Sequence, residues 1–158
     1  MKILVYGYGN PGRQDDGLGP ALAEKIESWL PDSGIDYVEV DSNYQLNIED
    51  ADAISDKDIV FFADASIEEI DKFIITEVKP DDAQIEFTMH AVSTDFVLDL
   101  CQKIYGKYPK TFLIHMKGYE WDFSEGLTEK GNESLEEAFE FIKPLLAEPS
   151  KIDELKLD

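Results

Sequence analysis

Short apolar runs rich in β-branched and aromatic residues alternate along this chain with segments whose apolar residues recur at helical spacing. The runs cover residues 2–8, 35–41, 58–66, 73–78 and 110–116, and the helical patterns cover residues 18–30, 94–105 and 135–142. Because the two kinds of segment alternate without an internal repeat, we predict one three-layer α/β domain with a mostly parallel five-stranded sheet flanked by helices. We place this domain at residues 1–146 and expect residues 147–158 to form a polar, loose tail. Pro31 is expected to stop the first helix, and Pro144 is expected to end or kink the last.

The chain is strongly acidic. Its 158 residues, enough for one domain with a substantial core, include 14 Lys and Arg against 35 Asp and Glu, which gives a net charge of −21. Such a surface repels phosphate backbones and anionic lipids, so we expect neither nucleic acid nor a membrane as a partner. It favours metal cations or basic peptides, although a charge of this kind also serves solubility alone.

Cysteine content and the N-terminal residues bear on where the protein resides. The single cysteine, Cys101, excludes an intramolecular disulfide and any multi-cysteine zinc site, and it lies in an apolar helical pattern typical of a buried thiol. The N-terminus lacks the long apolar region and the small-residue cleavage site of a secretory signal, and no apolar run approaches transmembrane length. We therefore expect a cytoplasmic protein.

The sequence GYGNPGRQDDG follows the first apolar run. Gly7, Gly9 and Gly12 have the G-x-G-x-x-G spacing that, in dinucleotide-binding folds, places the third glycine where a helix begins. Here the helical pattern starts only near residues 17–20, and the intervening RQDD would place two carboxylates beside the phosphates. Two like charges about 4 Å apart repel by about 4 kcal/mol at an effective dielectric of about 20, so the loop favours a cation over a phosphate. A nucleotide site with Asp41 as the ribose-binding acid is the alternative interpretation.

Three groups of polar residues in this pattern could bind such a cation. Asp15 and Asp16 follow the first run, Asp64 lies near the end of the third, and His90 precedes the helical pattern at residues 94–105. Ligands of parallel sheets bind beyond the carboxyl ends of the strands, where these residues are expected to gather. One imidazole and two carboxylates can bind zinc, nickel or iron and leave positions open for a substrate. We expect one of Asp15 and Asp16 to be the inward ligand and the other to cap a helix or to form an ion pair.

Each of these residues also has a purely structural interpretation. An Asp pair ahead of a helix often caps that helix, and Asp64 could cap the turn at residues 67–72. A lone histidine such as His90 is often satisfied within a core. His115, which lies inside the last apolar run, is expected to be a core histidine or to support a ligand rather than to be one.

The same residues resemble the hydrogenase maturation proteases, which remove the C-terminal extension of the large subunit of nickel-iron hydrogenases. GYGNPGRQDDGLG is similar to the family signature G-x-G-N-x-x-x-x-D-(D/E)-G-x-G. The resemblance continues through VEVD and QL, VFFADA, the histidine before the long helix, and GYEWDFSEGLTEKG, so that it covers nearly the whole chain. Where many members have D-G-G-T-x-G after the second strand, this chain has DSNYQL, which leaves the partner hydrogenase open.

This resemblance implies a nickel-dependent endopeptidase that has neither a catalytic serine or cysteine nor a resident metal. It places the three metal-binding and catalytic positions of the family on Asp16, Asp64 and His90. These residues would recognise nickel already inserted into the large-subunit precursor, which is then both partner and substrate. Cadmium or zinc could substitute for the nickel in crystals. The bound nickel would position the precursor's tail and polarise a carbonyl group or a water molecule for attack.

Two other functions are compatible with the same residues. The chain could be a binding module for a nucleotide or a metal cation on the same α/β sheet, or a homologue that assists hydrogenase assembly without cleaving. Binding of NAD or ATP would favour the module. Binding of nickel or cadmium that depends on His90 would favour the protease-like site.

Overall fold

The computed structural model describes residues 1–81 and 92–157. In this part of the chain the strands are β1 (Ile3–Tyr8), β2 (Val38–Asn43), β3 (Ile59–Ser66), β4 (Phe73–Val78) and β5 (Lys110–Lys117). The helices are α1 (Leu18–Ser33), α2 (Asp50–Ile54), α3 (Thr94–Tyr105) and α4 (Glu129–Ala147), with 3-10 helices η1 (Pro11–Gly17) and η2 (Pro149–Glu154). The strands form one sheet in the order β2-β1-β3-β5-β4.

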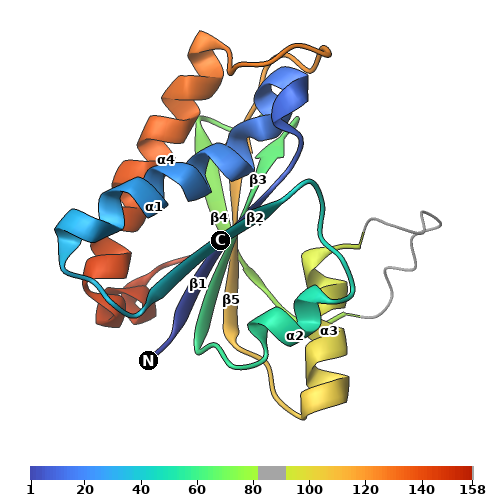
Figure 1. Cartoon of the computed structure of the whole chain (residues 1–158), viewed down its shortest axis with the longest axis vertical. Coiled ribbons are helices and arrows are strands. Elements are labelled where there is room, and N and C mark those ends of the chain that lie inside the picture. The colour runs from blue at the N-terminus through green and yellow to red at the C-terminus, as the bar shows by residue number, and fades with distance from the viewer. Residues whose placement is uncertain (82–91, 158) are drawn as a thin grey trace.

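The sheet is mostly parallel. β1 pairs in parallel with β2 and β3, and β3 pairs in parallel with β5, whereas the edge strand β4 runs antiparallel to β5. Helices α1 and α4 lie on one face of the sheet and α2 and α3 on the other (Figure 1). The predicted three-layer α/β fold is therefore confirmed. The carboxyl ends of β1, β2, β3 and β5 lie along one edge of the sheet, called the carboxyl edge below.

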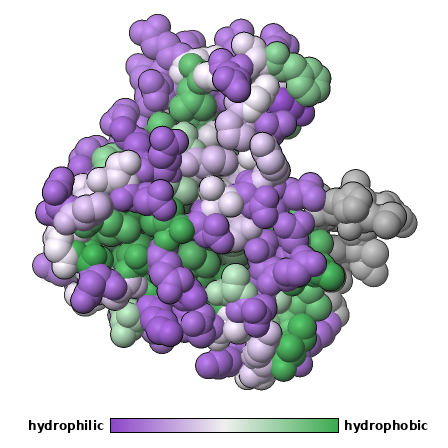
Figure 2. All heavy atoms as spheres, viewed as in Figure 1, coloured by the Kyte–Doolittle hydropathy of each residue, from purple (hydrophilic) through white to green (hydrophobic). Residues whose placement is uncertain are grey.

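The outer surface is mostly hydrophilic on the side shown in Figure 2, with a hydrophobic patch below α1. This agrees with a net charge of −21. Among the described residues, no helix combines the length and the apolar character needed to cross a membrane.

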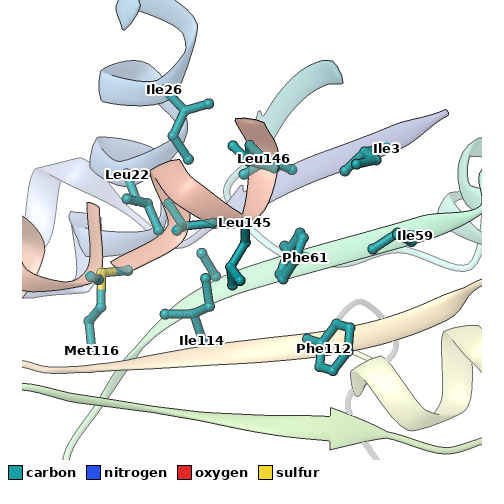
Figure 3. Packing of buried hydrophobic residues seen from close by; sticks show 14 of the residues in the cluster. Ile3, Leu22, Ile26, Ile59, Phe61, Phe112, Ile114, Met116, Leu145 and Leu146 are labelled. Carbon is teal, nitrogen blue, oxygen red and sulfur yellow. The ribbon is translucent and has the colours of Figure 1, made fainter. Parts of the chain in front are cut away.

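Alternate residues of each strand contribute to two separate cores. In β1, Ile3 and Val5 pack toward α1 and α4, whereas Leu4 and Tyr6 pack toward α2 and α3. The first of these cores appears in Figure 3, where labelled side chains include Leu22, Ile26, Phe61, Ile114, Leu145 and Leu146. Each such side chain, fully removed from water, contributes about 1.5–3 kcal/mol, so the sheet is held rigidly between its helices.

Neither proline ends its helix, although we expected Pro31 to stop the first helix and Pro144 to end or kink the last. α1 continues past Pro31 to Ser33 and ends where Gly34 takes a left-handed conformation with φ of 77°. α4 continues past Pro144 to Ala147. Each proline removes one backbone donor, but the helical path is kept near the helix end, where α4 still buries apolar side chains.

The second strand and the C-terminal segment also differ from the prediction. β2 begins and ends later than the predicted residues 35–41, and its last residue is Asn43. We expected residues 147–158 to form a loose tail, but η2 lies in this segment and Ile152 is only 2% exposed. Leu155 packs against the same core, so these residues help to close the face covered by α1 and α4.

Candidate active site

Asp15 is a buried structural anchor. Its side chain is fully buried, and one carboxylate oxygen accepts hydrogen bonds from the amides of Tyr119 and Glu120 at 2.8 and 3.3 Å. The Thr128 amide donates to the other oxygen at 2.8 Å, and the Thr128 hydroxyl donates to the first at 2.7 Å. Four donors saturate a carboxylate, so Asp15 has no oxygen left for a cation. Asp15 therefore ties η1 to the start of α4 rather than capping α1.

At two positions in this region, the chain packs so closely that only glycine fits. Gly131, in the first turn of α4, lies so close to Asp15 that a Cβ at this position would come within 2.5 Å of Asp15 Oδ1. Gly9 has φ of 143°, and a Cβ there would collide with the backbone carbonyl of Asp16. The glycine at the exit from β1 thus allows the chain to turn tightly past the backbone of Asp16.

The loop at residues 118–128, which follows β5, is held against η1 by two further residues. Arg13 donates from a guanidinium nitrogen to the Trp121 carbonyl at 3.1 Å and stacks 4.9 Å from the Phe123 ring centroid. The Gln14 amide donates to the Ser124 carbonyl at 2.8 Å. Gln14 has a positive φ of 48°, an uncommon conformation that these cross-loop contacts maintain. The two loops that carry the sequence motifs therefore form one rigid unit.

Asp16 has a different environment from its neighbour. Its side chain is partly exposed, and Oδ2 accepts a hydrogen bond from the Asn10 amide at 2.9 Å. This bond fixes the carboxylate and leaves acceptor positions unused, since a carboxylate can accept about four hydrogen bonds. Of the adjacent pair, Asp16 is therefore the residue that could bind a cation.

Asp64 lies on β3, on the sheet face that α2 and α3 cover. Its Oδ1 accepts a hydrogen bond from the Ala65 amide at 2.8 Å, and the Tyr8 hydroxyl donates to its carboxylate. Burial raises the pKa of Asp64 to about 7, and the negative charge of Asp16 adds to the rise, while the two hydrogen bonds act in the opposite direction. The structure therefore brings Asp16 and Asp64 near enough to interact. A buried acid near a like charge is unstable alone and favours a cation.

Tyr8 was not predicted as part of the site. It is the last residue of β1 and lies on the same face as Tyr6 and Phe62. Burial raises the pKa of the Tyr8 hydroxyl, and the charge of Asp64 raises it further, so Tyr8 stays a neutral hydrogen-bond donor. Tyr8 could have been predicted from the period-two alternation of Leu4, Tyr6 and Tyr8, because this alternation places the Tyr8 hydroxyl at the carboxyl edge.

His90 lies outside the described residues, so the third predicted ligand stays a prediction. Among residues 1–81 and 92–157, no three His, Cys, Asp or Glu side chains group closely enough to hold a metal ion. The described part of the site thus consists of two carboxylates, Asp16 and Asp64, and the hydroxyl of Tyr8.

Solved structures with a similar fold were found over nearly the whole chain. HycI from Thermococcus kodakarensis KOD1, a NiFe hydrogenase maturation protease, aligns with a TM-score of 0.73 and 23% identity over 92% of each chain. The hydrogenase maturating endopeptidase HybD from E. coli aligns with a TM-score of 0.74 and 23% identity over 94% of each chain. A hydrogenase 2 maturation peptidase from Thaumarchaeota archaeon SCGC_AB-539-E09 aligns with a TM-score of 0.68 and 24% identity, covering 92% of this chain and 98% of its own.

The chain has the same fold as these three maturation proteases. At this level of identity the similarity concerns the fold. No family model matches the sequence, and a search of curated proteins found no match either. Within this fold, the loop after β1 and the end of β3 are the segments that carry Asp16 and Asp64.

Other titratable residues of this chain are less suited to chemistry. His115 Nε2 lies 2.9 Å from the Thr76 hydroxyl oxygen, and burial lowers its pKa, which fits an internally satisfied histidine. Cys101 is buried, and burial raises the pKa of its thiol, which disfavours the nucleophilic thiolate. The capping role considered for Asp64 belongs to Ser66, whose Oγ accepts from the Glu68 amide at 3.1 Å.

The nucleotide interpretation does not gain support from the geometry. Gly12 lies near the start of η1, and α1 begins only after η1 ends, so the third glycine of the G-x-G-x-x-G spacing does not lie at the mouth of that helix. Asp41 accepts a hydrogen bond from the neighbouring Ser42 amide and is exposed on β2. The carboxyl edge presents acids where a pyrophosphate would require donors.

Proposed function

We propose that this chain is an endopeptidase that removes the C-terminal extension of a nickel-iron hydrogenase large-subunit precursor after nickel insertion. The observation that carries the proposal is the pairing of Asp16 with Asp64, whose pKa is raised to about 7 by burial and by the charge of Asp16, at the carboxyl edge of this fold. The motif resemblance and the fold similarity to maturation proteases from three organisms support it. We also expect the protein to act in the cytoplasm.

Nickel enters this reaction as part of the substrate. Asp16 and Asp64 would bind the nickel of the precursor through their carboxylate oxygens, and His90 is the proposed third ligand. A cation between the two carboxylates removes their mutual repulsion. This gain in free energy would make a nickel-loaded precursor bind more tightly than one without nickel. Tyr8 orients Asp64 by donating a hydrogen bond to its carboxylate.

The residues around the pair fix its geometry before the substrate arrives. The Asn10 amide holds Asp16, and the Ala65 amide with the Tyr8 hydroxyl holds Asp64. Asp15 locks η1 to α4 and so prevents Asp16 from moving with a loose loop. Such preorganisation lets the site hold the precursor's tail near the metal, where a carbonyl group or water molecule can react.

The proposal is tested by cleavage of a nickel-loaded large-subunit precursor with the purified protein, followed by intact-mass measurement. We expect the wild-type protein to release a C-terminal peptide. Asp16→Asn, Asp64→Asn and His90→Ala should each lower the rate roughly 100-fold or more, or about 2.7 kcal/mol in barrier height. Asp36→Asn is the matched control, because Asp36 is an exposed acid that precedes β2 at the opposite edge. Cleavage that survives the three site substitutions would refute the site assignment.

Titration calorimetry separates this function from a binding module. Nickel or cadmium should bind the wild-type protein and bind more weakly to Asp64→Asn and His90→Ala. Binding of NAD or ATP without metal binding would favour the module, and metal binding without cleavage would favour a homologue that assists assembly.

A further inference from the structure

Three exposed apolar side chains stand out in the described part of the chain. Phe123 is 87% exposed, Ile67 is 75% exposed and Tyr44 is 71% exposed, more than any other large hydrophobic residue there. Each follows a different strand of the sheet. Single exposed apolar residues are common, but these three follow strands that end at the same edge of the sheet, and this arrangement points to an interaction surface.

All three residues lie at the carboxyl edge. Tyr44 directly follows β2, Ile67 directly follows β3, and Phe123 lies in the 118–128 loop that follows β5. These strands are parallel, and β1 lies between β2 and β3. At about 4.8 Å between neighbouring strands, β2 and β5 are about 14 Å apart. The three side chains therefore span the edge that carries Asp16 and Asp64.

The backbone that carries Ile67 is fixed. Lys117, only 8% exposed, extends its ammonium group to the Glu68 carbonyl at 2.6 Å and to the Ile67 carbonyl at 3.5 Å. The Gly118 amide donates to the Ser66 carbonyl at 3.0 Å. The buried Lys117 thus donates to the backbone carbonyls of this turn, while the Ile67 side chain remains exposed to solvent.

Other contacts hold the segments that carry Phe123 and Tyr44. The Arg13 guanidinium lies 4.9 Å from the Phe123 ring centroid, and the next residue, Ser124, accepts from the Gln14 amide. The Tyr44 amide donates to Asn43 Oδ1 at 2.8 Å. A hollow of about 290 Å³ lies beside Tyr44, between the end of β2 and the loop after β1. Fixed backbones under exposed apolar tips reduce the entropy lost on binding, which is typical of binding hot spots.

Acidic side chains surround these tips. Glu68 and Glu69 follow Ile67, Asp122 and Glu125 flank Phe123, and Asp41 precedes Tyr44 on β2; all five acids are exposed. In Figure 2 the end of the molecule formed by the 118–128 loop, at the top, is mostly hydrophilic with isolated hydrophobic residues. The complementary surface carries apolar side chains or pockets with lysine and arginine around them.

We propose that Tyr44, Ile67 and Phe123 are the apolar anchors that dock the large-subunit precursor, through a basic-rimmed apolar surface next to its nickel site. This inference rests on the proposed function and adds the surface through which the protein binds the precursor. The anchors hold the folded body of the precursor, and the acid pair between them meets the metal.

The test uses a nickel-loaded large-subunit precursor and measures binding and cleavage separately. We compare the wild-type protein with the triple variant Tyr44→Ser, Ile67→Ser, Phe123→Ser. The matched control is Ile104→Ser with Tyr108→Ser, because both residues are exposed but lie in α3 and in the segment that leads into β5. The triple variant should bind the precursor roughly 100-fold more weakly, with KM raised and kcat nearly unchanged, whereas the control variant should match the wild type. Raising the salt concentration should weaken wild-type binding.

The outcomes separate this inference from the function on which it rests. A triple variant that binds and cleaves like the wild type overturns the docking surface and leaves the endopeptidase in place. A wild-type protein that neither binds nor cleaves the precursor overturns the proposed function and this inference with it. Equal loss in the triple variant and in the control also overturns the inference, because it shows that exposed apolar residues contribute wherever they lie.

Discussion

Two adjacent aspartates at the exit from β1 have distinct surroundings. Asp15 is buried and saturated with four hydrogen bonds, whereas Asp16 is partly exposed and accepts one from Asn10. The spacing predicted that one of the pair would face inward as a ligand but could not say which, and only the family resemblance indicated Asp16. The partners of Asp15 lie more than 100 residues away, at positions 119, 120 and 128, and no local spacing reveals them.

Replacement of Asp15 should destabilise the protein more than replacement of Asp16. In Asp15→Asn one oxygen acceptor becomes an amide donor that faces backbone N–H groups, so we expect the free energy of unfolding to fall by roughly 2–4 kcal/mol. Asp16→Asn should change it by less than about 1 kcal/mol. Urea denaturation of both variants gives the comparison. Equal losses would show that Asp15 does not anchor η1.

The raised pKa of Asp64 predicts a pH-dependent stability. An unfolded aspartate has a pKa of about 3.9, and in the folded protein Asp64 has a pKa of about 7. The unfolded state therefore loses this proton first as pH rises, so the contribution of Asp64 to stability is present below about pH 4 and is lost by about pH 7. Relative to the wild type, Asp64→Asn should gain about 1–2 kcal/mol of stability between pH 5 and pH 8, a value reduced for solvent screening.

Urea denaturation at the two pH values measures this difference. Asp16→Asn provides a second arm, because removing its charge lowers the pKa of Asp64 and should reduce the loss of stability with pH. A difference between Asp64→Asn and the wild type that stays constant from pH 5 to pH 8 would contradict the assigned environment.

At the level of elements, local signals predicted what local interactions determine. β4 has the predicted bounds, and α3 begins after Ser93, whose side chain accepts from the Phe96 amide as an N-cap. The errors arose where distant contacts decide, since α4 continues past Pro144 to bury Leu145 and Leu146. The packing of η2 on the core also depends on residues far away in the sequence. The contacts between η1 and the 118–128 loop likewise join residues far apart in the sequence.

A substitution at Gly131 tests whether η1 and the start of α4 are tightly packed together. Alanine is normally favoured over glycine in a helix by about 1 kcal/mol, but here its Cβ would come within 2.5 Å of Asp15 Oδ1. We expect Gly131→Ala to lower the free energy of unfolding by about 1–3 kcal/mol, as overpacking does in a rigid site. Asn132→Ala, at the exposed neighbouring position, should change it by less than about 0.5 kcal/mol. Stabilisation by Gly131→Ala would mean that α4 and η1 are not tightly joined.

For the whole molecule, the acidic character and the carboxyl edge lead to the same interpretation. A chain with a net charge of −21 places two interacting acids, Asp16 and Asp64, at the end of a parallel sheet, and this setting favours a cation and disfavours phosphate. The sequence predicted the fold and the edge, and it placed Asp16 and Asp64 at that edge, where the structure has them; their role as ligands stays a prediction. It missed Tyr8, because a tyrosine at the end of an apolar strand resembles a core residue until its hydroxyl is seen to meet Asp64.

If the acid pair recognises nickel carried by a hydrogenase large-subunit precursor, cleavage of that precursor depends on the nickel. The wild-type protein is therefore incubated with the same precursor prepared with and without nickel, and the mass of the large subunit is followed. We predict loss of a C-terminal peptide from the nickel-loaded precursor, none from the nickel-free one, and none from either with Asp64→Asn. Release of the peptide at equal rates from both precursors, or from neither with the wild-type protein, would contradict the account.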